Sequence, residues 1–216
     1  AIGAASTIGG AGTLTLSGVV SGTALTKTGA GTLVLSGAGA NTYTGLTTVS
    51  QGTLTAQKAA ALGTTAGGTT VASGATLNIN NVAIGAEALT IDGIGAGGVG
   101  ALTGTGAGAS LSGAVSLGAN SPTIGGAGTL TLSGVIANGA GNTLTKVGAG
   151  TLTLTNTDTY SGATTINGGG LTLSGATGTA LNTAFTVNQG GKLTLNNIAA
   201  NNVNRISDTT ALTLVG

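Results

Sequence analysis

The feature that most constrains the fold of this chain is a long internal recurrence. Residues Leu25–Leu54 read LTKTGAGTLVLSGAGANTYTGLTTVSQGTL, and most of this stretch returns at Leu144–Leu171 as LTKVGAGTLTLTNTDTYSGATTINGGGL. A second pair of segments, Ile8–Val19 and Ile124–Val135, is identical and reads IGGAGTLTLSGV in both places. Self-similarity of this kind is typical of repeat proteins, in which stacked units bury one continuous core. The sequence therefore predicts a stack of repeated units rather than a compact globule.

The recurrence divides the chain into two tandem units. The first covers residues 8–123 and the second covers residues 124–216, and the order of the segments within them is the same. The second unit stops at the equivalent of Gly93, so we expect it to be truncated. We expect residues 1–216 to form one continuous solenoid segment.

A shorter period lies inside each unit. Segments of the form Thr-Leu-Thr-Leu recur at intervals of 19 to 23 residues, which is less than the roughly 30 residues of a βαβ unit. Their alternation puts leucines on one face of a strand and Thr, Ser or Asn on the other. Glycines at the segment ends permit sharp corners, and no helical period is present. We therefore predict an all-β fold, a single parallel β-helix (β-solenoid) of about ten coils with negligible helix.

Composition argues against several classes of function. Five cations and four anions give a net charge of +1, which provides no basic stripe for nucleic acid or an acidic membrane surface. The chain has no His and no Cys for zinc, and it lacks the Gly-rich nonapeptide with which some β-helices bind calcium. No apolar run approaches the roughly 18 residues of a membrane helix. We expect no metal, no cofactor and no membrane insertion of this segment.

The carboxylates are too few and too scattered to suggest catalysis. A β-helix glycosidase or lyase needs two or three acidic groups that converge on the substrate. Glu87 and Asp92 are close in sequence and could meet across a corner, but no supporting group accompanies them. We interpret all four carboxylates as solvated turn charges and expect no enzyme. They are Glu87, Asp92, Asp158 and Asp208.

The recurring stretch carries a signature of Leu-Thr-Lys, Gly-Thr-Leu and a Tyr flanked by Thr and Gly. The signature residues outside the leucine segments are Lys27, Asn41, Tyr43 and Gly45 in the first copy and Lys146, Asp158, Tyr160 and Gly162 in the second. This signature closely resembles the autotransporter-associated β-strand repeat, also called the passenger-associated transport repeat, of large bacterial surface proteins. The resemblance covers about 30 residues twice and implies no catalytic residues.

The resemblance implies a passenger segment that forms a parallel β-helix outside the bacterial cell, on the cell surface or secreted. Together with the crossover preference of parallel strands, it implies a right-handed coil. The expected function is a non-catalytic stalk or an adhesin-type passenger segment, with a host or cell-surface receptor as an expected partner of the adhesin. Coil ends expose unpaired backbone groups, so we also expect neighbouring β-solenoid repeats to stack end to end, in the same chain or in identical copies. An extracellular structural fibre is the alternative function.

The signature side chains are expected to serve the corners of the coil. Alternation turns Lys27 and Lys146 toward the leucine face, so we expect each strand to end there and the amine to reach water beside the corner. Tyr43 and Tyr160 are expected to pack over a turn with the hydroxyl in water. Asp158 stands where the first copy has Asn41, which puts in question a hydrogen bond shared by both copies.

Outward threonines suggest ice binding as a third function. The Thr-x-Thr pairs are Thr13 and Thr15, Thr53 and Thr55, Thr129 and Thr131, and Thr151 and Thr153. Rows of such pairs on a flat face resemble the ice-binding surface of some antifreeze proteins. The same rows are interrupted by Val34, Gly170 and Lys192, among others, and threonine favours extended backbone for its own sake.

Overall fold

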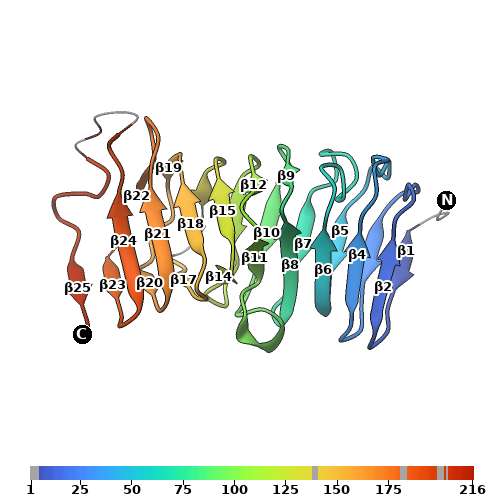
Figure 1. The fold of residues 1–216 in the computed structure, drawn as a ribbon, viewed down its shortest axis with the longest axis horizontal. Coiled ribbons are helices and arrows are strands. Elements are labelled where there is room, and N and C mark those ends of the chain that lie inside the picture. Colours follow the sequence, from blue (N-terminus) through green and yellow to red (C-terminus); the bar gives the residue numbers. More distant parts are fainter. Residues whose placement is uncertain (1–4, 138–140, 181–183, 199–201, 203) are drawn as a thin grey trace.

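The chain forms a rod of stacked β coils. The computed structural model describes residues 5–137, 141–180, 184–198, 202 and 204–216. Figure 1 shows the strands side by side along the rod, with the two termini at opposite ends. The strands that pair in these ranges do so in parallel, which confirms the predicted all-β parallel solenoid. The helical content of the same ranges is one turn of 3-10 helix, η1 (Ala96–Gly98).

Three long sheets form the sides of the rod. The seven-stranded sheet has the order β1 (Ser6–Ile8), β3 (Leu25–Lys27), β5 (Thr47–Val49), β7 (Thr69–Val71), β10 (Leu89–Ile91), β13 (Val115–Leu117) and β16 (Ile136–Ala137). The ten-stranded sheet has the order β2 (Thr13–Leu16), β4 (Thr32–Leu35), β6 (Gly52–Ala56), β8 (Ala75–Asn80), β11 (Leu102–Thr105), β14 (Thr123–Gly126), β17 (Leu144–Lys146), β20 (Thr164–Ile166), β23 (Phe185–Val187) and β25 (Leu212–Leu214). The six-stranded sheet has the order β24 (Gly191–Leu195), β21 (Gly169–Leu173), β18 (Thr151–Leu154), β15 (Thr129–Leu132), β12 (Ala109–Leu111) and β9 (Ala83–Ile84). A two-stranded sheet pairs β19 (Thr157–Asp158) with β22 (Thr179–Ala180).

The core consists of aliphatic side chains that stack from coil to coil. Leu33 is in register with Leu54, Leu54 with Leu77, and Leu77 with Leu102, and all four side chains are fully buried. Between them the strands place Thr, Val or Asn on the outer face, as the alternation predicts. Each coil therefore buries its leucines against the coils before and after it.

The number of turns is slightly smaller than expected. The rod makes about eight turns, whereas the sequence spacing predicts about ten coils. One cause lies near the C-terminus, where the spacing places Leu193 and Leu212 one coil apart. Leu193 lies in β24 of the six-stranded sheet and Leu212 lies in β25 of the ten-stranded sheet, so this interval is not a full turn.

The second unit is rotated by one side of the rod relative to the first. The Leu-Thr-Lys segment forms β3 of the seven-stranded sheet in the first unit and β17 of the ten-stranded sheet in the second. The following Thr-Leu-x-Leu segment likewise moves from the ten-stranded sheet (β4) to the six-stranded sheet (β18). Sequence-equivalent residues of the two units therefore face different directions around the rod.

The rotation follows from the length of the first unit. Counting along the seven-stranded sheet from β1 through β3, β5, β7 and β10 to β13 gives five full turns. The repeat of the β1 segment is β14, which follows β13 in the chain and lies one side further on, in the ten-stranded sheet. The first unit thus contains five turns and one side, and this non-integral number offsets the second unit.

Two leucines in the identical segments provide a matched test of the stacked core. Leu14 and Leu130 occupy the same position of IGGAGTLTLSGV, but Leu14 is 45 % exposed on the first coil and Leu130 is 1 % exposed between two coils. We expect Leu130→Ala to lower the free energy of unfolding by about 2–5 kcal/mol, because it leaves a cavity. Leu14→Ala should cost less than about 1 kcal/mol. Equal losses for the two variants in chemical denaturation would contradict the stacking.

Candidate functional site

The first signature corner is organised by a buried lysine. Lys27 is the last residue of β3, and its side chain is only 2 % exposed. Its Nζ donates hydrogen bonds to the carbonyl oxygens of Thr28 at 2.8 Å, Gly29 at 2.7 Å and Gln51 at 3.1 Å. Gln51 belongs to the next coil, so the ammonium group ties two consecutive corners together.

The second copy repeats this arrangement on another side of the rod. Lys146 ends β17, is 1 % exposed, and its Nζ donates to the carbonyl oxygens of Val147 at 2.7 Å, Gly148 at 3.1 Å and Gly168 at 3.3 Å. Burial lowers the pKa of Lys146 to about 8 and lowers that of Lys27 as well. Both strands end at the lysine as predicted, but the prediction that the amine reaches water is wrong. The corner carbonyls replace water as partners of the ammonium group, which removes the main cost of burying it.

The signature tyrosines are also buried, so the prediction of a solvated hydroxyl is wrong for both. Tyr43 is fully buried, and its hydroxyl hydrogen bonds with Thr47 Oγ1 at 2.8 Å. Tyr160 is 1 % exposed and makes the same contact with Thr164 Oγ1 at 2.6 Å. Burial raises the pKa of each phenol above its ordinary value. Each threonine points inward from the strand that follows, and the hydroxyl pair lets both polar groups enter the core.

One hydrogen bond is shared by Asn41 and Asp158. Asn41 is 2 % exposed, and its Oδ1 accepts from the backbone N–H of Val20 at 2.8 Å. Asp158 is equally buried, and its Oδ1 accepts from the N–H of Ile136 at 2.7 Å. Val20 and Ile136 are equivalent, because each directly follows the identical segment. The signature position therefore satisfies a backbone donor of the preceding coil whether it is an amide or a carboxyl.

Glycine in the signature is required by close packing of neighbouring coils. A Cβ atom at Gly45 would overlap the carbonyl oxygen of Thr23, and one at Gly162 would overlap that of Asn142. In each case the obstacle is backbone of the previous coil, which a side-chain rotation cannot relieve. The two glycines thus bring this corner into contact with the coil beneath it.

The two recurring stretches match a known protein family. The model of the passenger-associated-transport-repeat family matches residues 25–56 and 144–173. Two stretches of the chain are therefore similar to the passenger-associated transport repeat, and together they cover less than a third of its residues. This match confirms the resemblance inferred from the signature. The comparison with curated proteins gave no match, and neither did the comparison with solved structures.

The two matched stretches and the fold agree on the broad class of protein that this segment is similar to. The passenger-associated transport repeat belongs to autotransporter passenger domains, which are surface-exposed or secreted. In this chain the signature residues lie at the corners of the β-helix. They hydrogen bond to the backbone or, for Tyr43, to the side chain of Thr47 on the following strand. In the part of the chain that is described, no helix has the length and apolar character needed to cross a membrane. The signature therefore serves the stacking of coils.

The carboxylates do not converge on one place. The prediction that all four are solvated is wrong for two of them, Glu87 and Asp158. Glu87 is 2 % exposed and accepts a hydrogen bond from Thr69 Oγ1 at 2.7 Å, and burial raises its pKa. Asp92 has a different partner: its carboxylate accepts hydrogen bonds from the backbone N–H and the side-chain amide of Asn120. Asp158 is buried in the repeat corner, whereas Asp208 is exposed. Within the described residues no three acidic side chains gather where they could hold a metal ion.

Sequence reasoning missed two further buried cations. Arg205 is 2 % exposed and donates from its guanidinium to the carbonyls of Gly175 and Gly178, each at 2.8 Å. Lys58 is 6 % exposed and donates to the carbonyl of Gly18 at 3.0 Å. Four of the five cations of the chain are thus buried, and only Lys192 is exposed. The available signal was the scarcity of charge itself: the outward positions of the strands are filled mainly by Thr, Ser and Asn, so the few cations stand apart from this pattern.

The four Thr-x-Thr pairs do not lie on one face. Thr13 and Thr15 on β2 and Thr53 and Thr55 on β6 belong to the ten-stranded sheet, where β4 separates them. Thr129 and Thr131 on β15 and Thr151 and Thr153 on β18 are adjacent, but they belong to the six-stranded sheet. The rotation of the second unit is the reason.

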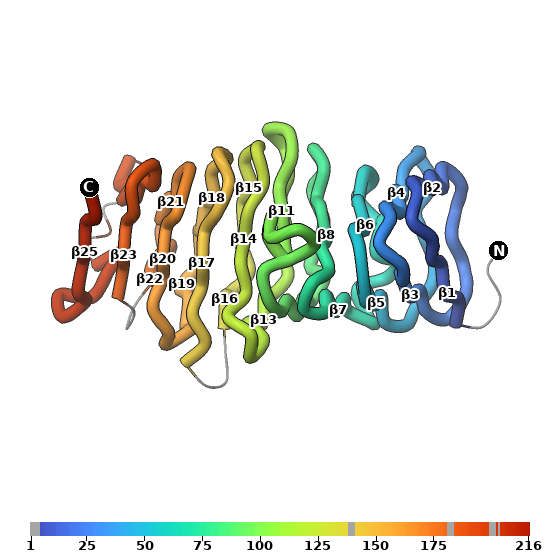
Figure 2. Tube along the Cα trace, turned by 90° about the horizontal axis from the view of Figure 1, so that it is seen from below, coloured from blue at the N-terminus to red at the C-terminus, as the bar shows by residue number. Residues whose placement is uncertain are grey.

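A loop further divides the threonine face of the ten-stranded sheet. The loop between β10 and β11 projects beside β11 in Figure 2. It is fastened to Thr76 of β8, whose Oγ1 accepts from Ala96 N at 2.9 Å and donates to the carbonyl of Gly100 at 2.8 Å. This face is therefore not a flat array of hydroxyl groups.

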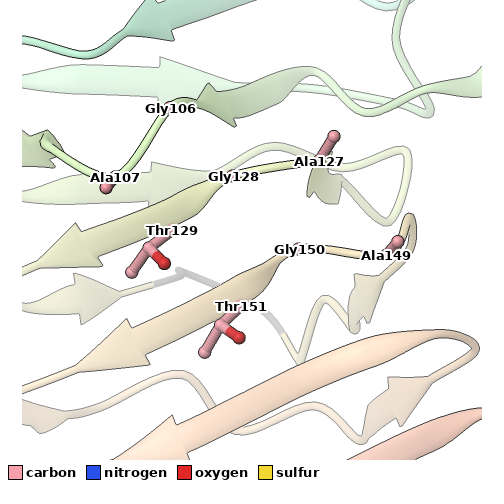
Figure 3. Close-up of a pocket in the computed structure, with 8 residues that line it drawn as sticks. All are labelled: Gly106, Ala107, Ala127, Gly128, Thr129, Ala149, Gly150 and Thr151. Atoms are coloured by element: carbon pink, nitrogen blue, oxygen red, sulfur yellow. The ribbon is translucent and has the colours of Figure 1, made fainter.

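A shallow hollow crosses three coils at the corner that leads into the six-stranded sheet. It measures about 450 Å³, and Figure 3 shows its lining of glycines and alanines, with hydroxyl groups from Thr129 and Thr151. No ionisable side chain lines it. The stacked Gly-Ala-Gly corners account for the hollow, because they have almost no side chain to fill it.

The lysine corners can be tested by removing the ammonium group. Lys146→Met keeps an unbranched chain of similar length but leaves three corner carbonyls without their donor. We expect it to lower the free energy of unfolding by about 1–3 kcal/mol. Lys192→Met is the matched control on the exposed lysine and should change it by less than about 0.5 kcal/mol. Thermal or chemical denaturation that ranks the two variants equally would contradict a structural role for the buried lysine.

Proposed function

We propose that this segment is a non-catalytic stalk within an extracellular bacterial passenger domain. The observation that carries the proposal is the unbroken ten-stranded sheet, which runs from β2 to β25 through both units. Each coil adds about 4.8 Å of length, and the connections between most strands are short, as Figure 1 illustrates. Short connections leave few sites for proteolysis. A rod of this kind holds whatever it carries away from the cell surface.

The absence of catalysis in this proposal is supported by how the polar side chains are used. Buried lysines bind corner carbonyls, buried tyrosines bind threonines, and Glu87 binds Thr69. The hollow across the Gly-Ala-Gly corners offers only neutral groups. These observations favour a structural role for the residues that would otherwise be candidates for chemistry.

The proposed partner of the rod is a further β-solenoid coil at each end. Leu14 is 45 % exposed, whereas Leu130, in the identical segment, is 1 % exposed because β12 and its coil precede it. Leu212 and Leu214, on the last strand, are 49 % and 73 % exposed. Among the residues that the structure describes, both end faces thus present core leucines and unpaired strand edges to a like coil.

An extracellular fibre of identical copies is the second candidate, because the same two end faces differ from each other. A contact between unlike faces does not close on itself and produces open filaments. An adhesin-type segment would instead use the polar Thr, Ser and Asn sides of the rod to bind a receptor. The division of the threonine pairs between two sheets gives no support to ice binding.

Antibodies raised against the purified segment test the proposal in the native bacterium. Intact cells should be labelled as strongly as permeabilised cells. Labelling seen only after permeabilisation would contradict an extracellular stalk. Regular filaments of labelled material in electron micrographs would favour the fibre, and isolated rods on the cell surface would favour the stalk.

A further inference from the structure

The two signature corners differ in one buried polar atom. In the first copy Asn41 uses both ends of its amide, because Oδ1 accepts from Val20 N and Nδ2 donates to the carbonyl oxygen of Ala61 at 2.7 Å. In the second copy Asp158 Oδ1 accepts from Ile136 N, but the buried Oδ2 has no hydrogen-bond partner. A buried carboxylate oxygen without a partner is costly, so its protonation state requires an explanation.

The carbonyl that Asn41 uses has a counterpart in the second copy. Asn41 N donates to the carbonyl of Ala60, the residue before its side-chain acceptor Ala61. Asp158 is in parallel register with Ala180, and Thr157 with Thr179. The register therefore puts Ala180 in the place of Ala61. An Asp158 side chain that carries a proton on Oδ2 could make the bond that the Asn41 amide makes.

We propose that Asp158 is a neutral carboxylic acid in the folded rod, that its Oδ2–H donates to the Ala180 carbonyl, and that loss of this proton loosens the contact between β19 and β22. The balance is simple: one proton passes from Asp158 to solvent, and one hydrogen bond between two coils is lost. This contact is a short one, because each strand has two residues. The corner is thus a pH-sensitive joint in the second repeat, and Asn41 makes the first repeat insensitive.

The surroundings favour the neutral acid. Burial raises the pKa of Asp158 to about 7, and the hydrogen bond from Ile136 opposes this only in part. Strands β16 and β22 bring no ionisable side chain to the corner. Tyr160 follows two residues later, and its phenol is neutral at these pH values because burial raises its pKa. Arg205, whose carbonyl accepts from Ala180 N, directs its guanidinium to the carbonyls of Gly175 and Gly178.

The sign of the pH effect follows from proton linkage. The folded-state pKa of about 7 lies above the roughly 3.9 of an aspartate in an unfolded chain. Between these values the Asp158 carboxyl of the folded state binds more protons than that of the unfolded chain. Its contribution to stability is therefore highest below about pH 4 and falls as the pH rises to about 7. A stable carboxylate would give the opposite slope. The proposal rests on this corner alone and does not depend on the function of the rod.

The two copies provide a reciprocal exchange of residues as the test. Thermal unfolding is followed from pH 4.5 to pH 8 for the parent protein, Asp158→Asn and Asn41→Asp, and the Cγ resonance of Asp158 is titrated by NMR. We expect the Asp158 carboxyl to titrate near pH 7 and Asp158→Asn to be more stable than the parent at pH 8, by at least about 3 °C in Tm. Asn41→Asp should add a second loss of stability over the same pH range.

Two results would overturn the proposal: titration of Asp158 near pH 4, or the same pH dependence of Tm in the parent and in Asp158→Asn. Glu87 is also buried, but it is present in every variant, so the comparison cancels its contribution. If the Asn41→Asp variant does not fold at pH 8 but refolds at pH 4.5, this supports the proposal. If the variant folds at neither pH, the NMR titration of Asp158 and the Tm of Asp158→Asn decide.

Discussion

The structure depends on the register with which each coil lies on the next. Leucines at equivalent positions stack directly on one another, and the backbone between them is bonded to both neighbouring coils. A shift by one residue would turn the leucines of that strand outward and its threonines into the core. Stability is therefore a sum over neighbouring coils, and the same coil is well packed in the middle of the rod and half-exposed at its end. Leu130 and Leu14 show this difference with identical local sequences.

The corners maintain this register. A coil that turns within two or three residues leaves carbonyl groups that no strand can satisfy, and the chain supplies buried donors for them. Lys27 and Lys146 each bind three such carbonyls, and Arg205 and Lys58 bind others. Asn41 and Asp158 do the reverse: their side-chain oxygens accept hydrogen bonds from backbone N–H groups. Four of the five cations are therefore internal, and the outer faces of the strands carry mainly hydroxyl and amide groups.

The sequence predicted the strands and their stacking well, because alternation and spacing report directly on which side chains enter the core. The fate of the corner residues could not be obtained in the same way. Alternation correctly directed Lys27 inward, but whether its amine finds carbonyl partners depends on the path of Gln51, one coil later. Tyr43 raised the same difficulty, since its partner Thr47 is buried only when the next strand is in place. The rotation of the second unit could not be predicted from the sequence either. The length of a repeat in residues does not specify how many sides of the rod the repeat covers. Residues 93–101, which include η1, are part of a coil longer than its neighbours, and such differences in coil length determine where each segment falls.

The central claim is that each coil advances along the rod by one strand spacing. Pulsed electron–electron double resonance, which measures distances between two spin labels, tests this advance directly. The chain has no cysteine of its own, so pairs of spin labels can be placed at chosen positions. One label is fixed at Thr13 and the second is moved along the outer face of the ten-stranded sheet to Thr145, Thr165, Thr186 and Thr213. These lie six, seven, eight and nine strands away, so at about 4.8 Å per strand the distances should rise in even steps from about 29 Å to about 43 Å. Distances that fail to increase along this series, or that stay below about 25 Å throughout, would contradict a stacked rod.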